Sequence, residues 1–235
     1  MLKQENIYSI KSKADKVLAV IILAAALPFS LLTAIVLTLI LKSTPLIVQE
    51  RGITEENKVF KIYKFRTMKR QAESSKEEKE KDILYKRYLA EYVPVFCRWL
   101  RKTGLDELPQ IINVIKGEMS LIGPRPLMMS DLEILRKRYP EYYRVRGEIK
   151  VKPGITGLWQ VYGRREEGIE NLLHLDREYD REVSFGLDAR IFLSTIPLIF
   201  RGKHSDAVIS GMRDEERKQS SREGIVINSV ISCEG

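Results

Sequence analysis

Residues Val17–Leu41 read VLAVIILAAALPFSLLTAIVLTLIL, an uncharged run that is bracketed by Lys16 and Lys42. As a helix of about 25 residues, each rising about 1.5 Å, this run is about 37 Å long. That length exceeds the roughly 30 Å hydrocarbon core of a bilayer. The run is also longer than the apolar region of a secretory signal, and no small-x-small cleavage site follows it before Lys42. The sequence therefore predicts a membrane element.

Pro28, near the middle of the run, leaves two topologies open. An interior proline removes a helix hydrogen bond and clashes with the preceding turn, so the apolar arms are about 16 and 20 Å long and neither spans a bilayer alone. The positive-inside rule, applied to basic residues on both flanks, favours a re-entrant hairpin that turns at Pro28 with both ends in the cytoplasm. The alternative is a kinked spanning helix, since bilayer helices tolerate proline by local repair. The basic residues are Lys3, Lys11, Lys13 and Lys16 before the run, then Lys42, Arg51, Lys58, Lys61, Lys64 and Arg66 after it.

The rest of the composition is that of an ordinary globular protein. The 235 residues are 44% hydrophobic and 31% charged, which excludes a wholly disordered chain and fits one compact unit. Lys and Arg number 40 against 32 Asp and Glu, a net charge of +8. Such a charge points to a polyanionic partner, which can be nucleic acid, anionic lipid or a phosphorylated substrate.

Cysteine and histidine are too few for several classes of site. Cys97 and Cys233 lie far apart, which argues against a disulfide framework and against a cysteine-based zinc site. With only His174 and His204, a site of several imidazoles cannot be assembled, and a Ser-His-Asp arrangement has two poor candidates. We therefore expect carboxylates and cations to carry the chemistry, in a reducing cytoplasm.

Hydrophobic periodicity predicts an α+β chain that is mainly α. One short strand is expected at Val59–Tyr63, where apolar and charged residues alternate. Prolines and glycines make Leu121–Pro126 extended or turned, and Val151–Gly163 a loop with short strands. Helices are expected over Lys69–Glu91, Asp106–Gly117, Asp131–Tyr143, Glu170–Glu182 and Asp188–Phe200.

Three of these helices bear on function. Lys69–Glu91 is dense in Glu and Lys, so we interpret it as a solvated helix without chemistry. Asp106 is expected to cap its helix, with Pro109 in the first turn. Asp188–Phe200 either lies on the membrane surface or is a buried core helix, and the pattern favours neither. The expected parts are a membrane helix with its flanks at 1–45, a catalytic domain at 46–202 and a polar tail at 203–235.

The strongest candidate for chemistry is RKTGLDELPQ at Arg101–Gln110. Successive helical residues diverge by about 100°, so Asp106 and Glu107 can reach different sides of one phosphate. One carboxylate can then attack phosphorus while the other holds a divalent metal, and the helix N-terminus favours phosphate there. Taken alone, acidic residues that open a helix are better explained as capping.

Three further elements present cations. Gly123–Pro126 holds Arg125 between two prolines, Lys64 and Arg66 flank Phe65 after the predicted strand, and Arg164 follows a glycine-shaped loop. Each of these elements alone is explained as a turn or a solvated edge. Together with the paired acids and the membrane run, they indicate phosphate chemistry at a membrane surface.

Four ordered motifs resemble those of the bacterial sugar transferases. This family contains the monotopic phosphoglycosyl transferases, which move a sugar 1-phosphate from a nucleotide sugar to a polyprenyl phosphate. The resemblance extends from the hydrophobic run to about Phe200 and is to the small form, without the additional spanning helices of larger members. Gln49–Lys58 departs from the family pattern. The motifs are KFRTM at Lys64–Met68, RKTGLDELPQ at Arg101–Gln110, MSLIGPRP at Met119–Pro126, and KPGITGLWQ with a following GR at Lys152–Arg164.

The resemblance implies a re-entrant helix broken at Pro28 and a small cytoplasmic catalytic domain with membrane-surface helices. By motif, Asp106 is expected to be the nucleophile and Glu107 the carboxylate associated with Mg²⁺, with Asp106 as a further possible metal ligand. The residues expected to contact phosphates and nucleotide are Lys64, Arg66, Arg101, Arg125 and Arg164.

The function that the resemblance implies is transfer of a sugar 1-phosphate from a nucleotide sugar, expected to be a UDP-sugar, to undecaprenyl phosphate. The products are polyprenyl-diphosphate-sugar and UMP, formed through an aspartyl intermediate as the first membrane step of polysaccharide or glycoconjugate biosynthesis. The expected location is the bacterial inner membrane, with the catalytic domain facing the cytoplasm. Expected partners are nucleotide sugar, polyprenyl phosphate and membrane phospholipid, and not nucleic acid.

Two alternatives remain at this point. One is a single-step ternary transfer in which Asp106 is only a metal ligand. The other is a membrane-tethered basic binding protein without enzymatic activity. The binding protein would need only dispersed cations, and it would not need the paired acids.

Overall fold

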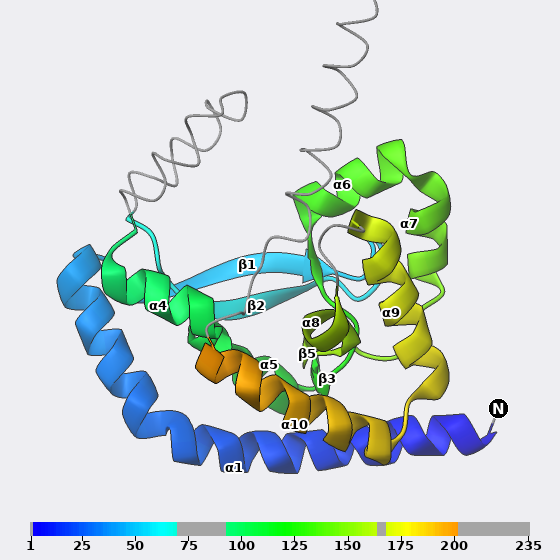
Figure 1. Ribbon diagram of the computed structural model, residues 1–235, viewed down its shortest axis with the longest axis horizontal. Coiled ribbons are helices and arrows are strands. Elements are labelled where there is room, and N and C mark those ends of the chain that lie inside the picture. The colour runs from blue at the N-terminus through cyan, green and yellow to red at the C-terminus, as the bar shows by residue number, and fades with distance from the viewer. Residues whose placement is uncertain (1, 70–92, 164–167, 202–235) are drawn as a thin grey trace, which may run out of the picture.

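The computed structural model describes residues 2–69, 93–163 and 168–201 (Figure 1). The predicted solvated helix after Lys69, the predicted tail at 203–235 and the candidate Arg164 lie outside the described residues.

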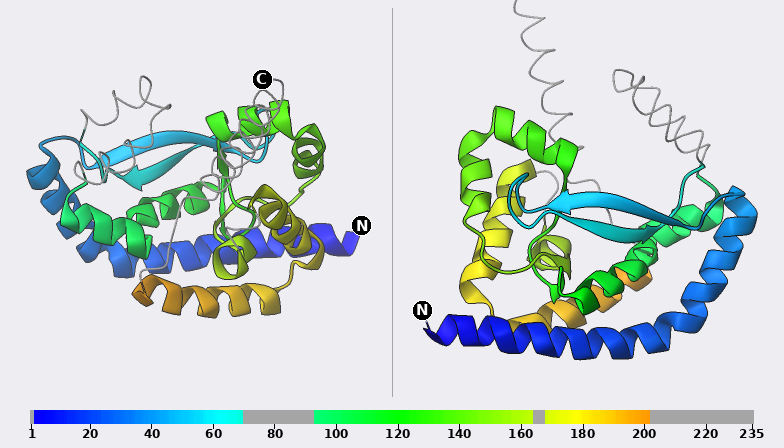
Figure 2. Two further views of the ribbon diagram at one scale, coloured as in Figure 1. Left: turned by 45° about the horizontal axis from the view of Figure 1, so that its top comes forward. Right: turned by 180° about the vertical axis from the view of Figure 1, so that it is seen from behind.

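The apolar run lies within α1 (Leu2–Leu41), a helix of 40 residues with Pro28 inside it. Figures 1 and 2 show that α1 bends part-way along and that its C-terminal part approaches α4 (Val95–Thr103). Sharp bends in helices arise mostly at proline. The expected break is therefore a bend within one continuous helix. Over Ile7–Leu41 this helix is long and apolar enough to cross a membrane.

A small antiparallel sheet follows α1. Its strand order is β2-β1-β4, with β1 at Leu46–Gly52, β2 at Phe60–Phe65 and β4 at Leu127–Met128. β2 confirms the predicted strand. β1 was not predicted, although it pairs with β2 from Leu46 opposite Phe65 to Arg51 opposite Phe60.

A second sheet pairs β3 (Ser120–Ile122) in parallel with β5 (Gly154–Thr156). The strand ends approach so closely that a Cβ on Gly154 would lie 2.1 Å from the nitrogen of Gly123. Close contact between the two backbones therefore explains why positions 123 and 154 are glycines. The extended conformation predicted for Leu121–Pro126 and the short strand in Val151–Gly163 are confirmed.

The predicted helix at Asp106–Gly117 is two elements, and the capping role of Asp106 was wrong. A 3₁₀ helix, η1 (Leu105–Gln110), precedes α5 (Ile111–Lys116). Gly104 occupies the cap position with φ 74°, and no side chain caps η1. A glycine in this left-handed conformation lets η1 start directly at the end of α4.

The remaining helices mostly follow the predicted pattern. The predicted helix Asp131–Tyr143 is split, because Pro140 starts a new helix and lacks the N–H that would continue the old one. The short helix α8 in the KPGITGLWQ region was missed. The bounds are α6 Met129–Arg138, α7 Pro140–Gly147, α8 Leu158–Tyr162, α9 Gly168–Glu182 and α10 Phe185–Arg201.

The main core lies where α5 packs between the β1/β2 hairpin and α1. Ala19, Ile62 and Val114 are nearly or wholly buried in it. The C-terminal arm of α1 packs on α4 in a second core, where Leu37, Cys97 and Leu100 are fully buried. α1 is thus part of the packed domain along both of its arms.

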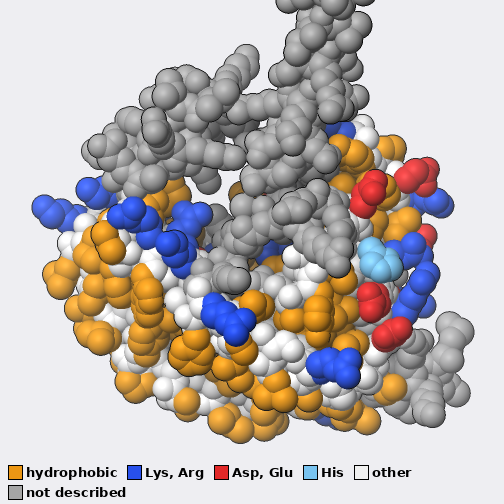
Figure 3. Space-filling view, in the orientation of Figure 1, with side chains coloured by type: hydrophobic (Ala, Val, Ile, Leu, Met, Phe, Trp, Pro, Cys, Tyr) orange, Lys and Arg blue, Asp and Glu red, His pale blue; other side chains and the backbone are white. Residues whose placement is uncertain are grey.

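Exposed apolar side chains gather over α1, α4 and α10 (Figure 3). On α10 only Ile191 is fully buried, whereas Leu193 is 64% and Phe200 86% exposed. On α4, Val95 is 72% and Trp99 44% exposed. The core-helix interpretation of Asp188–Phe200 is therefore wrong for most of its apolar residues.

Candidate active site

Asp106 and Glu107 lie on η1 directly after the Gly104 turn. The Glu107 N–H donates to the carbonyl of Gly104 at 3.0 Å, which closes the first turn of η1. Both acidic residues are buried, Asp106 at 5% and Glu107 at 6% exposure. Buried carboxylates need partners that compensate their charge.

Lys64, at the end of β2, is a cationic partner of Glu107. Its Nζ lies 2.5 Å from Oε1 of Glu107, and the pair is buried. β2 and η1 pack against each other, so a long-range contact joins the KFRTM motif to the RKTGLDELPQ motif.

Arg125 reaches the same place from the loop between β3 and β4. Its guanidinium carbon lies 4.3 Å from the ring centre of Trp159 on α8, a cation–π arrangement. The Trp159 indole N–H donates to the carbonyl of Gly123 at 3.2 Å, which fixes the ring beneath the loop.

These residues line one small cavity. Its volume is about 10 Å³, room for about one water molecule. Lys64 and Arg125, both predicted to contact phosphate, are joined there by Arg51 of β1, which the sequence had indicated only as a flanking charge. The lining residues are Arg51, Ile62, Lys64, Glu107, Gln110, Arg125, Pro126, Gly154, Ile155 and Trp159.

The other predicted cations are placed differently. Arg66 is buried, and its Nε donates to the carbonyl of Thr44 at 3.1 Å, which joins β2 to the end of α1. Arg101 is exposed on α4. Neither lines the cavity, so the structure brings together two of the four described candidates.

Asp106 is buried on η1, close enough to α4 to act on Cys97. It acts electrostatically on Cys97: burial raises the pKa of this thiol, the Arg101 charge opposes the shift, and the Asp106 charge adds to it. Glu107 lines the cavity and Asp106 does not, so the expectation that both carboxylates reach one phosphate stays a prediction.

The donor set fits an incomplete magnesium site. Within the described residues, no group of three His, Cys, Asp or Glu side chains could hold a metal ion. Mg²⁺ commonly binds through one or two carboxylates and takes its other ligands from substrate phosphates and water. Asp106 and Glu107 can supply that carboxylate share, so the residues present fit Mg²⁺ only together with a phosphorylated substrate.

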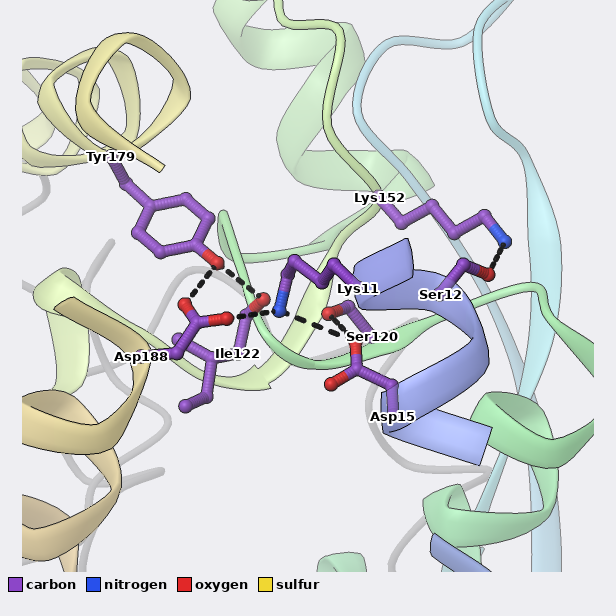
Figure 4. A network of polar contacts seen from close by, with 8 residues as sticks. All are labelled: Lys11, Ser12, Asp15, Ser120, Ile122, Lys152, Tyr179 and Asp188. Atoms are coloured by element: carbon purple, nitrogen blue, oxygen red, sulfur yellow. Dashed lines mark hydrogen bonds and ion pairs between the residues drawn. The ribbon is translucent and has the colours of Figure 1, made fainter. Parts of the chain in front are cut away.

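A polar network ties α1 to β3, α9 and α10 (Figure 4). Lys11 of α1 pairs with Asp188 of α10 at 2.6 Å and with Asp15 at 3.2 Å. The hydroxyl of Ser120, on β3, donates to Asp15. The N-terminal arm of α1 is thus bonded to the strand that leads to Arg125.

Tyr179 of α9 extends this network. Its hydroxyl lies 2.7 Å from Oδ1 of Asp188 and 2.9 Å from the carbonyl of Ile122. Burial raises the pKa of Asp188, and the Lys11 charge opposes that shift. Burial and the Asp188 charge likewise raise the pKa of Tyr179, so this side chain remains a neutral donor.

The sequence profile of the bacterial sugar transferase family matches residues 6–202. The chain belongs to this family. The family expectation drawn from the four motifs is therefore confirmed.

Three relatives in the bacterial sugar transferase family illustrate the match. The galactosyl transferase CpsE of Streptococcus agalactiae is 33% identical over 67% of this chain and 35% of its own length. The undecaprenyl-phosphate galactose phosphotransferase of Salmonella typhimurium is 34% identical over 67% of this chain and 34% of its own. The UDP-glucose:undecaprenyl-phosphate glucose-1-phosphate transferase of Escherichia coli is 37% identical over 80% and 39%. The chain spans little more than a third of each.

Proposed function

We propose that this protein transfers a sugar 1-phosphate from a nucleotide sugar, in our assignment a UDP-sugar, to undecaprenyl phosphate. The observation that supports this most directly is a buried Asp106-Glu107 pair beside a cavity with three cationic side chains, Arg51, Lys64 and Arg125. Relatives of the chain are named as undecaprenyl-phosphate galactose and glucose phosphotransferases. A binding protein with dispersed cations would not need buried, paired acids.

The first step places the donor pyrophosphate against the cations. The cavity has room for about one water molecule, so donor binding requires side chains such as Lys64 or Arg125 to move outward. A carboxylate oxygen of Asp106 then attacks the phosphorus that bears the sugar, and the bond from that phosphorus to the bridging oxygen breaks. UMP leaves with its charge compensated by the cations.

The second step regenerates the carboxylate. A phosphate oxygen of the polyprenyl phosphate attacks the phosphorus of the Asp106 adduct, and the acyl phosphate bond breaks. Polyprenyl-diphosphate-sugar forms and Asp106 is free again. Glu107, with Asp106 as a further ligand, would hold Mg²⁺, which would neutralise charge on the phosphates.

The proposed location follows from α1 and from the apolar surface of α4 and α10. We assign α1 as re-entrant, with residues 1–45 in or at the bacterial inner membrane and the catalytic domain 46–202 on the cytoplasmic side. Exposed side chains such as Trp99, Leu193 and Phe200 would then lie among lipid. This arrangement brings the site to the depth of the lipid phosphate.

The test is a single-turnover reaction with donor and no lipid. UDP-glucose or UDP-galactose with Mg²⁺ should release one equivalent of UMP and leave the protein heavier by a hexose phosphate. Asp106→Asn should abolish both signals while donor binding survives, and Glu107→Gln should weaken the response to Mg²⁺. Glu133→Gln, on exposed α6, serves as the matched control and should behave as wild type.

Other outcomes would overturn parts of the proposal. UMP release that waits for the lipid would support the single-step ternary transfer with Asp106 as a metal ligand. An adduct on Glu107 would reverse the two roles. Full turnover after chelation of divalent ions would remove Mg²⁺ from the proposal, and binding of lipid without any turnover would leave a binding protein.

A further inference from the structure

Another buried ion pair joins α7 to α9. Arg146 of α7 and Asp176 of α9 are joined at 2.6 Å, and each side chain is only 1% exposed. Neither residue lines the cavity. Burying such a pair has a large desolvation cost, so the pair contributes little to stability as such and needs another explanation.

Both members of the pair bind the main chain of Arg125. Asp176 Oδ1 accepts the N–H of Arg125 at 3.2 Å, and a terminal nitrogen of Arg146 donates to the carbonyl of Arg125. The pair therefore satisfies both backbone polar groups of the residue whose side chain stacks on Trp159.

The sequence explains why Arg125 needs this support. Pro124 and Pro126 flank it, so neither neighbour has an N–H and the segment cannot join a regular helix or strand ladder. A buried N–H and carbonyl without partners would be costly. In GPRP these partners come from two distant helices instead of from a neighbouring strand.

Arg146 also binds the segment that directly follows β1. Its Nε donates to the carbonyl of Ile53 at 2.8 Å. Ile53 lies two residues after Arg51, the arginine that β1 contributes to the cavity lining. One buried guanidinium is thus bonded to both segments that supply cavity arginines.

We infer that Arg146 and Asp176 are positioning residues, which hold Arg125 over Trp159 and fix its position relative to Arg51. The catalytic consequence rests on the proposed function, in which Arg125 contacts the donor phosphates. The geometric part of the inference, the alignment of Arg125 on Trp159, is independent of any activity.

The experiment has an optical and a kinetic readout. Trp99 and Trp159 are the only two tryptophans, so Trp99→Phe leaves Trp159 as a single fluorophore. In that background, Asp176→Asn should raise the acrylamide quenching constant of Trp159, because Arg125 no longer covers the ring. With UDP-glucose or UDP-galactose as donor, kcat/KM should fall on the order of tenfold, mainly through KM, as expected for the loss of a charged hydrogen-bond partner.

Arg146→Lys is a second variant, which keeps the inference testable if Asp176→Asn does not fold. It keeps the positive charge, but an ammonium lacks the planar fork that reaches Asp176, Arg125 and Ile53 together, so it should not rescue either readout. Arg125→Lys should give a similar quenching increase. Val114→Ala, in the core beside α1, is the control for general destabilisation and should leave the quenching constant unchanged at temperatures where it is folded.

The outcomes separate this inference from the proposed function. Unchanged Trp159 quenching in both Asp176→Asn and Arg146→Lys, or a kcat/KM equal to that of Val114→Ala, would overturn the positioning role. A wild-type protein without donor turnover, but with the expected quenching changes, would overturn the proposed function and support the placement of Arg125 by the pair.

Discussion

Lys64 Nζ lies 2.5 Å from Oε1 of Glu107, and the two side chains are only 6% and 7% exposed. The contact joins residues 43 positions apart in sequence and brings the two motifs that contain them to one cavity. Such a pair compensates its own desolvation only while both charges are present. A nucleotide-sugar donor that enters the cavity therefore encounters a Glu107 carboxylate that is already paired with Lys64.

Lys64→Met tests this pair through stability. It removes the cation beside a buried carboxylate, so we expect the free energy of unfolding to fall by about 3–5 kcal/mol. The double variant Lys64→Met/Glu107→Gln should recover much of this loss, because the uncompensated charge is gone. Urea denaturation in detergent measures both values.

The matched control for this stability test is an exposed pair. Lys137 and Glu133 on α6 are 2.7 Å apart, but their side chains are 65% and 52% exposed. Lys137→Met should leave the unfolding free energy within error, since solvent screens exposed pairs. A Lys64→Met variant as stable as Lys137→Met would show that the buried contact is not formed in solution.

The topology prediction concerns the bend of α1 at Pro28. In a background without native cysteines, Lys13→Cys and Lys61→Cys, both at exposed positions, should resist an impermeant thiol reagent on intact spheroplasts and react after lysis. Pro28→Ala restores the helix hydrogen bond, so part of the Lys13→Cys population should become accessible from outside. Leu27→Ala, the adjacent control, should not change the labelling. Labelling of Lys13→Cys from outside with Pro28 intact would identify a spanning helix.

The sequence predicted the parts of this site that depend on local pattern. The apolar run, the strand before Lys64, the GPRP turn and the helix at Glu170–Glu182 all follow from periodicity or from proline and glycine. The motif resemblance also predicted that Lys64, Glu107 and Arg125 belong to one site. All three line the same cavity.

What the sequence missed depends on long-range contacts. LIVQERG in β1 has a strand-like apolar start, but its strand partner is visible only in the folded chain, so Arg51 was counted merely as a flanking charge. The main-chain partners of Arg125 come from α7 and α9, which no local pattern indicates. The predicted cap role of Asp106 was wrong because the left-handed turn at Gly104 fills that position.

The membrane-facing assignment of α4 predicts contact between Trp99 and lipid chains. Trp99 is 44% exposed beside Val95, whereas Trp159 is 6% exposed inside the domain. In liposomes, lipids brominated on their acyl chains should therefore quench the wild-type fluorescence partly, and Trp99→Phe should lose most of that quenching. Equal quenching in the two proteins would place α4 away from the bilayer and contradict the proposed orientation.

The last prediction uses the Cys97 thiol, which is fully buried on α4. Burial raises its pKa, so between the ordinary thiol pKa and the raised value the unfolded chain has lost a proton that the folded chain keeps. Stability must then fall as pH rises through that interval, because proton binding favours the folded state there.

Cys97→Ala should lack this slope, and urea denaturation from pH 7.5 upward in a Cys233→Ser background measures the difference. Lys102→Cys in the Cys97→Ala variant, at an exposed polar position on the same helix, should not restore the slope. A wild-type protein that becomes more stable relative to Cys97→Ala as pH rises would contradict a raised pKa and, with it, the packing of α4 against the C-terminal arm of α1.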